Sequence, residues 1–309
     1  MDRQDSIDDP KRLLLTGATG FIGNRLRERL LQEGHLLTVV TRNPDRHKAD
    51  RAGNHRFISW EPEGLSEAMG QVDGVIHLAG ENVAGGRWTA ERRRAIHDSR
   101  VETTRRLVDA MAAAEKKPEC LVSASAVGLY GDRGEERLDE DSAPGTGFLS
   151  MVCRDWEAEA RKAEALGVRV AIPRIGVVLG REGGILERMW LPFMMGVGGP
   201  VGSRSIYLPW IHVEDVCRGL EFPLEHASFN GAYNLCAPEP VTMGAFARTL
   251  GRVLNRPSLF TVPRFVLRMV LGEGEQAVTA SLRTVPHALQ KAGFRFRFEE
   301  LEAALADLC

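Results

Sequence analysis

The segment RLLLTGATGFIG, residues 12–23, decides the fold of this chain. A short apolar run ends in glycines with the spacing GxxGxxG, and a segment with helical periodicity follows to Glu33. A turn of this kind between a strand and a helix is typical of dinucleotide binding. Gly17 permits the tight turn, Gly20 lets the backbone approach a pyrophosphate, and Gly23 lets the helix pack close to the strand. The first N–H groups of the helix would face the phosphates; a glycine-rich turn without a ligand is the alternative.

Apolar runs and helical segments alternate along the first part of the chain. Strands are expected near 12–16, 36–40, 57–60, 72–79, 120–125 and 168–173, and helices near 21–33, 89–115 and 148–166. This alternation predicts an α/β fold, a Rossmann-type doubly wound parallel sheet, over residues 11–180. Residues 181–309 begin rich in Gly and Pro and continue with shorter helices and turns. We expect them to form a smaller C-terminal α/β lobe for the substrate, packed on the first domain.

The amino-acid composition limits the kinds of molecule that this chain is expected to bind. The 309 residues include 40 Lys and Arg against 42 Asp and Glu, a net charge of −2, which argues against nucleic-acid or anionic-membrane binding through bulk charge. The five cysteines form no CxxC pair, so we expect no metal site, no disulfide framework and a reducing, cytoplasmic location. The first twelve residues are polar and predict no secretory signal. No apolar stretch is long enough to span a bilayer.

The end of the second expected strand bears on the choice of nucleotide. An acidic residue there would bind the 2′-hydroxyl of NAD, whereas an arginine accommodates the 2′-phosphate of NADP. The strand ends Thr41-Arg42, with no acid at either position. This predicts NADP(H) as the cofactor, with a solvated surface arginine as the alternative.

Further motifs resemble those of the extended short-chain dehydrogenase/reductases. They are DGVIHLAG at 73–80, SAS at 123–125, LYG at 129–131, PRIGVVLG at 173–180 and WIHVED at 210–215. Narrower motifs resemble the atypical subgroup of "epimerase family proteins", also called SulA-related nucleoside-diphosphate-sugar epimerases. These include LAGEN at 78–82, SRVET at 99–103, WE at 156–157, GGPVGS at 198–203 and APEPVT at 237–242. The resemblance runs from about residue 12 to 307.

The glycine turn, the strand ends and this resemblance together imply a set of cofactor contacts. They are Gly17, Thr19, Gly20, Phe21, Ile22, Gly23, Thr41, Arg42, Leu78, Ala79, Gly80, Glu81, Arg100, Ser123 and Val178. Arg100 stands where the extended family has an Asn that orders its catalytic Lys, and it could supply positive charge to the cofactor or be a surface residue. Glu81 could instead act as a buried carboxylate base or lie on the surface.

The family's catalytic pair, a Tyr followed four residues later by a Lys, is missing. The tyrosines are Tyr130, Tyr207 and Tyr233, and none has a Lys four residues on. Aligning the following helix by its Trp-Glu motif places Leu149 and Cys153 where the pair should be. A leucine cannot exchange a proton, and a cysteine on a helix is more often a small core residue.

Ser125 is the candidate catalytic residue, because at the end of the fifth strand it could polarise a carbonyl. Candidate substrate contacts are Tyr130, Trp190 and His212, with packing as the alternative for the first two and a structural link between lobe and sheet for the third.

Two functions follow. The first is an epimerase/reductase-like NADP(H)-dependent enzyme acting on an unknown small carbonyl, alcohol or nucleotide-sugar. The second is a catalytically silent NADP(H) sensor or regulatory protein, with cell division as one context. The extended family often dimerises through helices at about 89–114 and 148–166. Because these helices carry exposed Arg and Glu here, both a monomer and a homodimer are open.

Overall fold

The computed structural model describes residues 10–47 and 53–309, so the expectation about a secretory signal concerns a segment that lies largely outside the described residues. An eight-stranded parallel sheet forms the centre, in the order β12-β8-β5-β4-β1-β2-β3, with β6 also paired to β8. Its strands are β1 (Arg12–Thr16), β2 (Leu36–Val40), β3 (His55–Ile58), β4 (Gly74–His77), β5 (Cys120–Ser123), β6 (Ser125–Ala126), β8 (Arg169–Ile175) and β12 (Gly231–Leu235). The Rossmann-type fold class predicted from the sequence is confirmed.

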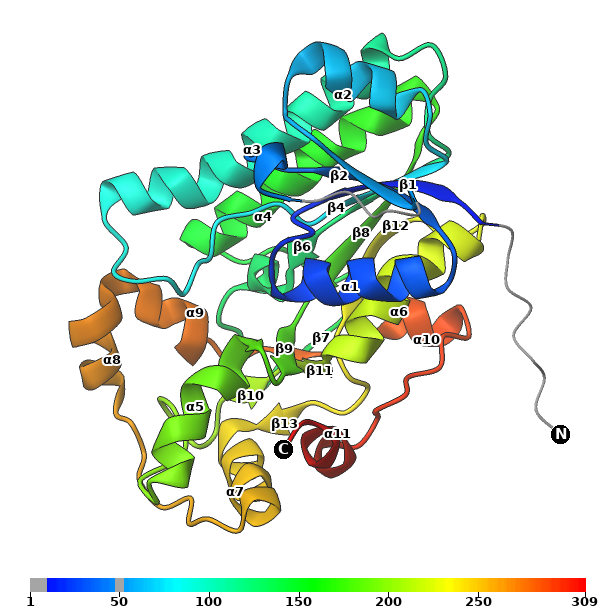
Figure 1. The fold of residues 1–309 in the computed structure, drawn as a ribbon. Coiled ribbons are helices and arrows are strands. Elements are labelled where there is room, and N and C mark those ends of the chain that lie inside the picture. Colours follow the sequence, from blue (N-terminus) through cyan, green and yellow to red (C-terminus); the bar gives the residue numbers. More distant parts are fainter. Residues whose placement is uncertain (1–9, 48–52) are drawn as a thin grey trace, which may run out of the picture.

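The strands read as nearly continuous apolar runs because both faces of the sheet are covered. On β1, Leu13 and Leu15 enter one hydrophobic cluster and Leu14 enters the other, and all three are buried. The helices α2 (Pro62–Met69), α3 (Ala90–Ala113) and α4 (Phe148–Arg161) cover one face (Figure 1). The helices α1 (Phe21–Gln32) and α6 (Val213–Glu225) pack together on the other.

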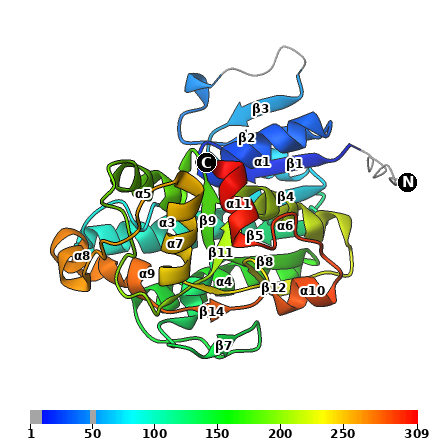
Figure 2. The ribbon, with the colours of Figure 1, turned by 90° about the horizontal axis from the view of Figure 1, so that it is seen from below.

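The remaining elements form a smaller lobe at the carboxyl ends of the strands. Its helices are α5 (Gly184–Met194), α7 (Met243–Leu254), α8 (Arg264–Leu271), α9 (Gln276–Thr279) and α11 (Leu301–Leu308). Its short strand pairs are β9 (Val177–Gly180) with β11 (Trp210–His212), and β10 (Tyr207–Leu208) with β13 (Val241–Thr242). Figure 2 shows α7 and α11 beside β9 and β11, where Trp210, Phe246 and Leu305 share a core. A third short pair joins β7 (Arg137–Leu138) to β14 (Arg283–Thr284), and helix α10 (His287–Lys291) follows it. The described chain also contains the 3-10 turns η1 (Pro44–Arg46), η2 (Val127–Tyr130), η3 (Lys162–Leu166) and η4 (Gly272–Glu275).

The chain crosses between these two parts more than once. Helix α6 and strand β12 come from beyond residue 180, yet they belong to the central sheet and its cover. A boundary at residue 180 therefore does not separate the central sheet from the lobe. The division into domains 11–180 and 181–309 stays a prediction. The expected strand at 120–125 is interrupted at Ala124, and the expected helix at 148–166 ends in the tight turn η3.

The glycine turn is built by close backbone contacts. Gly17 has φ +70°, and a Cβ added there would lie 2.6 Å from the carbonyl carbon of Leu78. A Cβ at Gly23 would lie 2.2 Å from the carbonyl oxygen of Gly17. Because both neighbours are backbone atoms, neither can move aside, and only glycine lets α1 approach β1 and β4 so closely.

We therefore expect Gly23→Ala to lower the free energy of unfolding by about 2–3 kcal/mol, the usual cost of overpacking a rigid site. Gly64→Ala is the matched control, because this helical glycine has no atom within 4 Å of an added Cβ. The control should be neutral or stabilising by up to about 1 kcal/mol. Urea unfolding measures both variants, and equal stabilities would contradict the packing argument.

Candidate functional site

A buried chain of hydrogen bonds holds the turn of β1 against the end of β4. Thr104 on α3 donates its hydroxyl hydrogen to the carbonyl of Arg100 (2.6 Å), so it must accept from His77 Nε2 at 3.0 Å. The Nδ1 atom of His77 therefore accepts from the hydroxyl of Thr16 at 2.6 Å. The oxygen of Thr16 in turn accepts from the backbone N–H groups of Leu78 and Ala79, each at 3.2 Å. Each hydroxyl hydrogen has an acceptor, so the loop after β4 is fixed beside the glycine turn.

Burial keeps the His77 ring neutral. It is fully buried, and desolvation, aided by the positive charge of Arg100, lowers the pKa of His77 to about 3. A charged ring would also have a second ring N–H, which could no longer accept from Thr16.

Arg100 lies between the loop after β4 and the ring of Trp156. Its guanidinium would lie 3.1 Å from a Cβ placed on Gly80, so it covers the loop after β4. It stands 5.2 Å from the centre of the Trp156 ring and donates to the carbonyl of Ile96 at 2.9 Å. Burial lowers the pKa of Arg100, and within the described residues no carboxylate forms an ion pair with it. A buried cation without a counter-ion favours an anionic or electron-rich ligand.

Ser125 is placed differently from its expected role. It is buried, and its hydroxyl donates to Glu157 Oε1 at 2.7 Å. Glu157 also receives two hydrogen bonds from Arg174, at 2.9 and 3.0 Å. Because the carboxylate can only accept, the single hydrogen of Ser125 is already committed. This geometry does not support Ser125 as the donor that polarises a substrate carbonyl, and it gives Ser125 a supporting role beside Glu157.

Tyr130 continues the same network in the core. It has no exposed surface, donates to Asn234 Oδ1 at 2.7 Å and accepts from Arg174 at 2.9 Å. Burial raises the pKa of Tyr130 to about 12. The packing alternative is therefore favoured over a substrate contact.

A cavity of about 780 Å³ opens beside this network, between the sheet and the lobe. Ala126 and Ile175, which end β6 and β8, line it together with residues of α4 and α5. Leu149 and Cys153, the residues expected in place of the missing catalytic pair, both face this cavity. Desolvation raises the pKa of Cys153 to about 11, so its thiol stays protonated at neutral pH. The cavity lies where ligands bind in such sheets, at the carboxyl ends of the strands.

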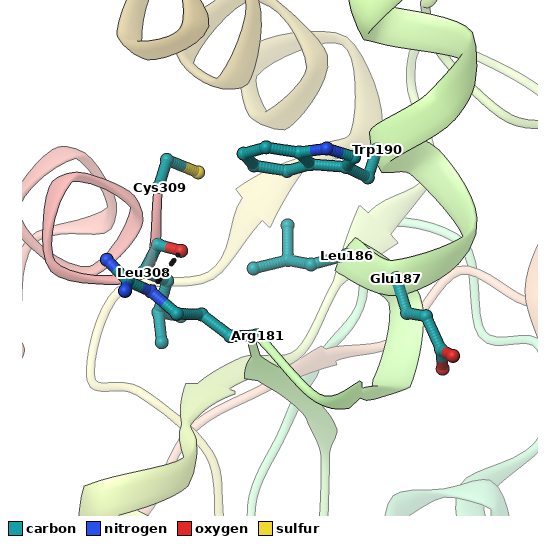
Figure 3. Close-up of a pocket in the computed structure, with 6 residues that line it drawn as sticks. All are labelled: Arg181, Leu186, Glu187, Trp190, Leu308 and Cys309. Carbon is teal, nitrogen blue, oxygen red and sulfur yellow. Dashed lines mark hydrogen bonds between the residues drawn. The ribbon is translucent and has the colours of Figure 1, made fainter.

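Trp190 and His212 lie outside the lining of this cavity. Trp190, on α5, lines a separate pocket of about 390 Å³ with Leu186, Arg181 and Cys309 (Figure 3). His212 caps α6 by accepting from the backbone of Glu214 at 3.1 Å. Its ring centre also lies 3.9 Å from that of Phe298, so the structural alternative is favoured for His212.

Of the expected cofactor contacts, the structure brings the glycine turn, Leu78, Ala79, Gly80 and Arg100 together. Phe21 and Val178 both lie close to Gly184. A Cβ added at Gly184 would lie 3.5 Å from the Phe21 ring and 2.3 Å from the carbonyl oxygen of Val178. Ser123 is buried, and its hydroxyl has no hydrogen-bond partner within the described chain.

The other expected contacts lie farther out or have partners of their own. Arg42 is exposed, and Thr41 accepts weakly from Asn43 at 3.5 Å. Glu81 forms an ion pair with Arg92 at 2.8 Å, so its carboxylate already has a partner.

Sequence reasoning missed Glu157 and Arg174 as site residues. The WE motif at 156–157 was the available signal, but nothing in it reveals the partner on β8. In the parts of the chain that the structure describes, no group of three or more His, Cys, Asp or Glu is arranged to hold a metal. No helix within those parts has the length and apolarity to cross a membrane.

Comparisons with known proteins agree with this fold. The sequence profile of the NAD dependent epimerase/dehydratase family matches residues 13–236, and that of DUF1731, a domain of unknown function, matches 262–308. Epimerase family protein YfhF of Bacillus subtilis is 36% identical over 96% of this chain and 97% of its own length. The chloroplastic homologue of epimerase family protein SDR39U1 from Arabidopsis thaliana is 40% identical over 94% of this chain and 84% of its own length.

Two solved structures extend the comparison. Human epimerase family protein SDR39U1 (isoform 2), crystallised with NADPH, has a TM-score of 0.86 and 33% identity, with 96% of this chain and 98% of that chain covered. A nucleoside-diphosphate sugar epimerase from Corynebacterium glutamicum has a TM-score of 0.75 and 31% identity, with 97% of this chain and 58% of that chain covered.

The sheet, the glycine turn and the missing Tyr-Lys pair define an atypical extended short-chain dehydrogenase/reductase. The chain belongs to the NAD dependent epimerase/dehydratase family, within the group of epimerase family proteins. The family predicted from the sequence motifs is thereby confirmed.

The His77 network predicts a pH-dependent stability. Because the folded pKa is about 3 against about 6.5 in the unfolded chain, the unfolded state binds more protons between these values. The stabilisation is fully present above pH 6.5 and is lost as the pH falls, by about 2 kcal/mol at pH 5.

Urea unfolding of the wild type and of His77→Gln between pH 7 and 5 measures this effect. The variant should lose stability less steeply with falling pH. His97→Gln is the control, since hydrogen bonds to Asp98 and Asp155 raise the pKa of this partly exposed histidine, and its contribution is lost as pH rises. If His77→Gln and the wild type show parallel pH curves, the neutral buried ring is not the cause.

Proposed function

We propose that this protein is an NADP(H)-dependent oxidoreductase that binds the dinucleotide at the glycine turn and a small substrate in the adjoining cavity. The observation that carries the proposal is the position of Arg100, which covers Gly80 in the loop held beside the glycine turn and also lines the cavity. One side chain thus contacts both places where the two reactants of a hydride transfer would bind.

The residues at the turn fit a dinucleotide. Gly20 precedes α1 without a side-chain cap, so the N–H groups at the start of this helix are not bonded by a capping side chain. A helix N-terminus of this kind attracts phosphate. The hydroxyl of Ser123, on the strand next to β4, is buried and has no hydrogen-bond partner among the described residues. These features support the turn and strand-end contacts expected from the sequence.

Arg42 supports NADP(H) over NAD(H). It lies two residues beyond the end of β2, is exposed, and has no acidic neighbour at position 41 that would bind a 2′-hydroxyl instead. The human relative was crystallised with NADPH, which agrees with this choice.

The chain's own groups would bind and orient the reactants. A reduced nicotinamide supplies a hydride when bound. The charge of Arg100 would stabilise an electron-rich oxygen near Cys153 and Trp156, and the cavity walls would exclude water. The proton would come from solvent or from the substrate itself, because Leu149 cannot provide one and the Cys153 thiol holds its proton tightly.

This shortage of proton donors favours a second candidate, a cofactor-binding sensor without turnover. Leu149 and Cys153 replace the acid–base pair, and Ser125 is committed to Glu157. Regulation, with cell division as one context, would then depend on cofactor occupancy. In either case the free cysteines, four of them buried, suit a reducing compartment such as the cytoplasm.

A titration with NADPH and NADH tests the cofactor assignment. We expect Arg42→Ala to weaken NADPH binding about 10- to 100-fold, towards the NADH value, because a charge-assisted contact to phosphate is worth roughly 1.5–3 kcal/mol. Arg106→Ala is the matched control, an exposed arginine on α3. Equal affinity for both nucleotides in the wild type would contradict the NADP(H) preference, and binding of neither would contradict the proposed function.

A second measurement separates enzyme from sensor. The NADPH complex is mixed with small aldehydes and ketones, and the absorbance at 340 nm is followed. The enzyme predicts a loss of absorbance that Arg100→Gln slows at least about tenfold, as expected when a group that stabilises charge in the transition state is removed. NADPH binding with stable absorbance for every carbonyl compound would favour the sensor.

A further inference from the structure

We propose that the substrate part of the cavity takes an uncharged apolar molecule with a single carbonyl or alcohol group, and that it does not take a nucleoside-diphosphate sugar. This inference rests on the proposed function, since it names the substrate class for the same site. It differs from a nucleoside-diphosphate sugar, the ligand that appears in the name of the Corynebacterium relative.

The charges around the cavity are balanced once Arg100 is set aside. Within the described chain, the other charged residues that line it are Asp132, Glu187, Arg188 and Arg264, two acids and two bases. Arg264 is already paired with Glu275 at 2.9 Å. A diphosphate needs cations that are free to neutralise it, because a buried anion without a partner is strongly disfavoured. Arg188 donates to the carbonyl of Ala84 at 2.9 Å, and the two acids leave these four residues without an excess of positive charge.

Two of the polar side chains that could bind sugar hydroxyls are already engaged within the protein. Asp132 Oδ1 accepts from the backbone of Gly134 and Ser281, both at 3.2 Å. The hydroxyl of Ser150 donates to carbonyl oxygens of Gly128 and Thr146, both at 3.2 Å. A sugar hydroxyl that met only these two groups would lose hydrogen bonds to water without full replacement, at a cost for each.

Many of the other lining residues are apolar. Leu149 and Val152 face the cavity from α4, Ile185 and Met189 from α5, and Val262 and Leu267 from the segment leading into α8 and from α8 itself. An apolar chain buried here would gain affinity with each methylene. Arg100, near Gly80, is a buried cation without a carboxylate partner among the described residues, and it could meet the oxygen of such a ligand.

The test is calorimetric binding of hexan-1-ol, octan-1-ol and decan-1-ol to the full-length protein, with and without saturating NADPH. We expect the affinity to rise about fourfold for each added methylene, the increment for burying one such group. UDP-glucose, added to the NADPH complex under the same conditions, should give no saturable binding. Affinities that do not depend on chain length, or saturable UDP-glucose binding, would overturn the inference.

Leu149→Asn locates the binding. This change puts an amide on the cavity wall, so decanol affinity should fall at least about tenfold. Met151→Asn on the same helix is the matched control, because Met151 is exposed and is not part of the cavity wall. Equal decanol affinity in both folded variants would contradict binding in this cavity. The chain-length series in the wild type stands as a test even if Leu149→Asn does not fold.

The two proposals can fail separately. Failure to bind NADPH at all refutes the proposed function, whereas alcohol binding without nucleotide still tests the ligand class of the cavity. NADPH binding together with absent alcohol binding refutes the substrate class alone.

Discussion

The hydrogen-bonded chain Thr104–His77–Thr16 is the constraint on which the site depends. It ties α3, β4 and β1 together in the interior and fixes the backbone of Leu78 and Ala79 beside the glycine turn. Every hydrogen in the chain has one acceptor, which selects a single tautomer of His77 and a single direction of donation. A buried polar network that is fully satisfied in this way specifies one arrangement of three elements more strictly than apolar packing would.

A second buried network supports the opposite side of the cavity. Ser125, Glu157, Arg174 and Tyr130 join β6, α4, β8 and η2 through short hydrogen bonds. The serine that a dehydrogenase would present to its substrate is here bonded into the protein interior. Arg100, which has no carboxylate partner in the described chain, lines the cavity. Under the proposed function, the site would bind a dinucleotide and a substrate without the Tyr and Lys that the sequence lacks.

Much of the fold could be predicted because its signals are local. The glycine spacing, the apolar strand runs and the helix at 90–113 follow from short-range periodicity and turn chemistry. The place of β12 could not be predicted, since a five-residue strand far along the chain gives no sign of pairing with β8. The outcome for Trp190 has a related origin, because a helix has two faces and the nearby sequence does not say which one meets the cavity. The outcome for His212 depends on its place at the end of β11, where it caps α6.

The sequence by itself determined the fold class, the family, the dinucleotide turn and the loss of the Tyr-Lys pair, since each of these is carried by residues adjacent in the chain. Only the tertiary structure decided which partners these residues meet. Glu157 takes the hydrogen of Ser125 because β6 and α4 pack side by side, 32 positions apart in the chain. Arg100 and Gly80, likewise distant in sequence, come together because α3 lies along β4 and β5. Hydrogen-bond direction, burial and charge balance are properties of such contacts, and they exist only once the chain has folded.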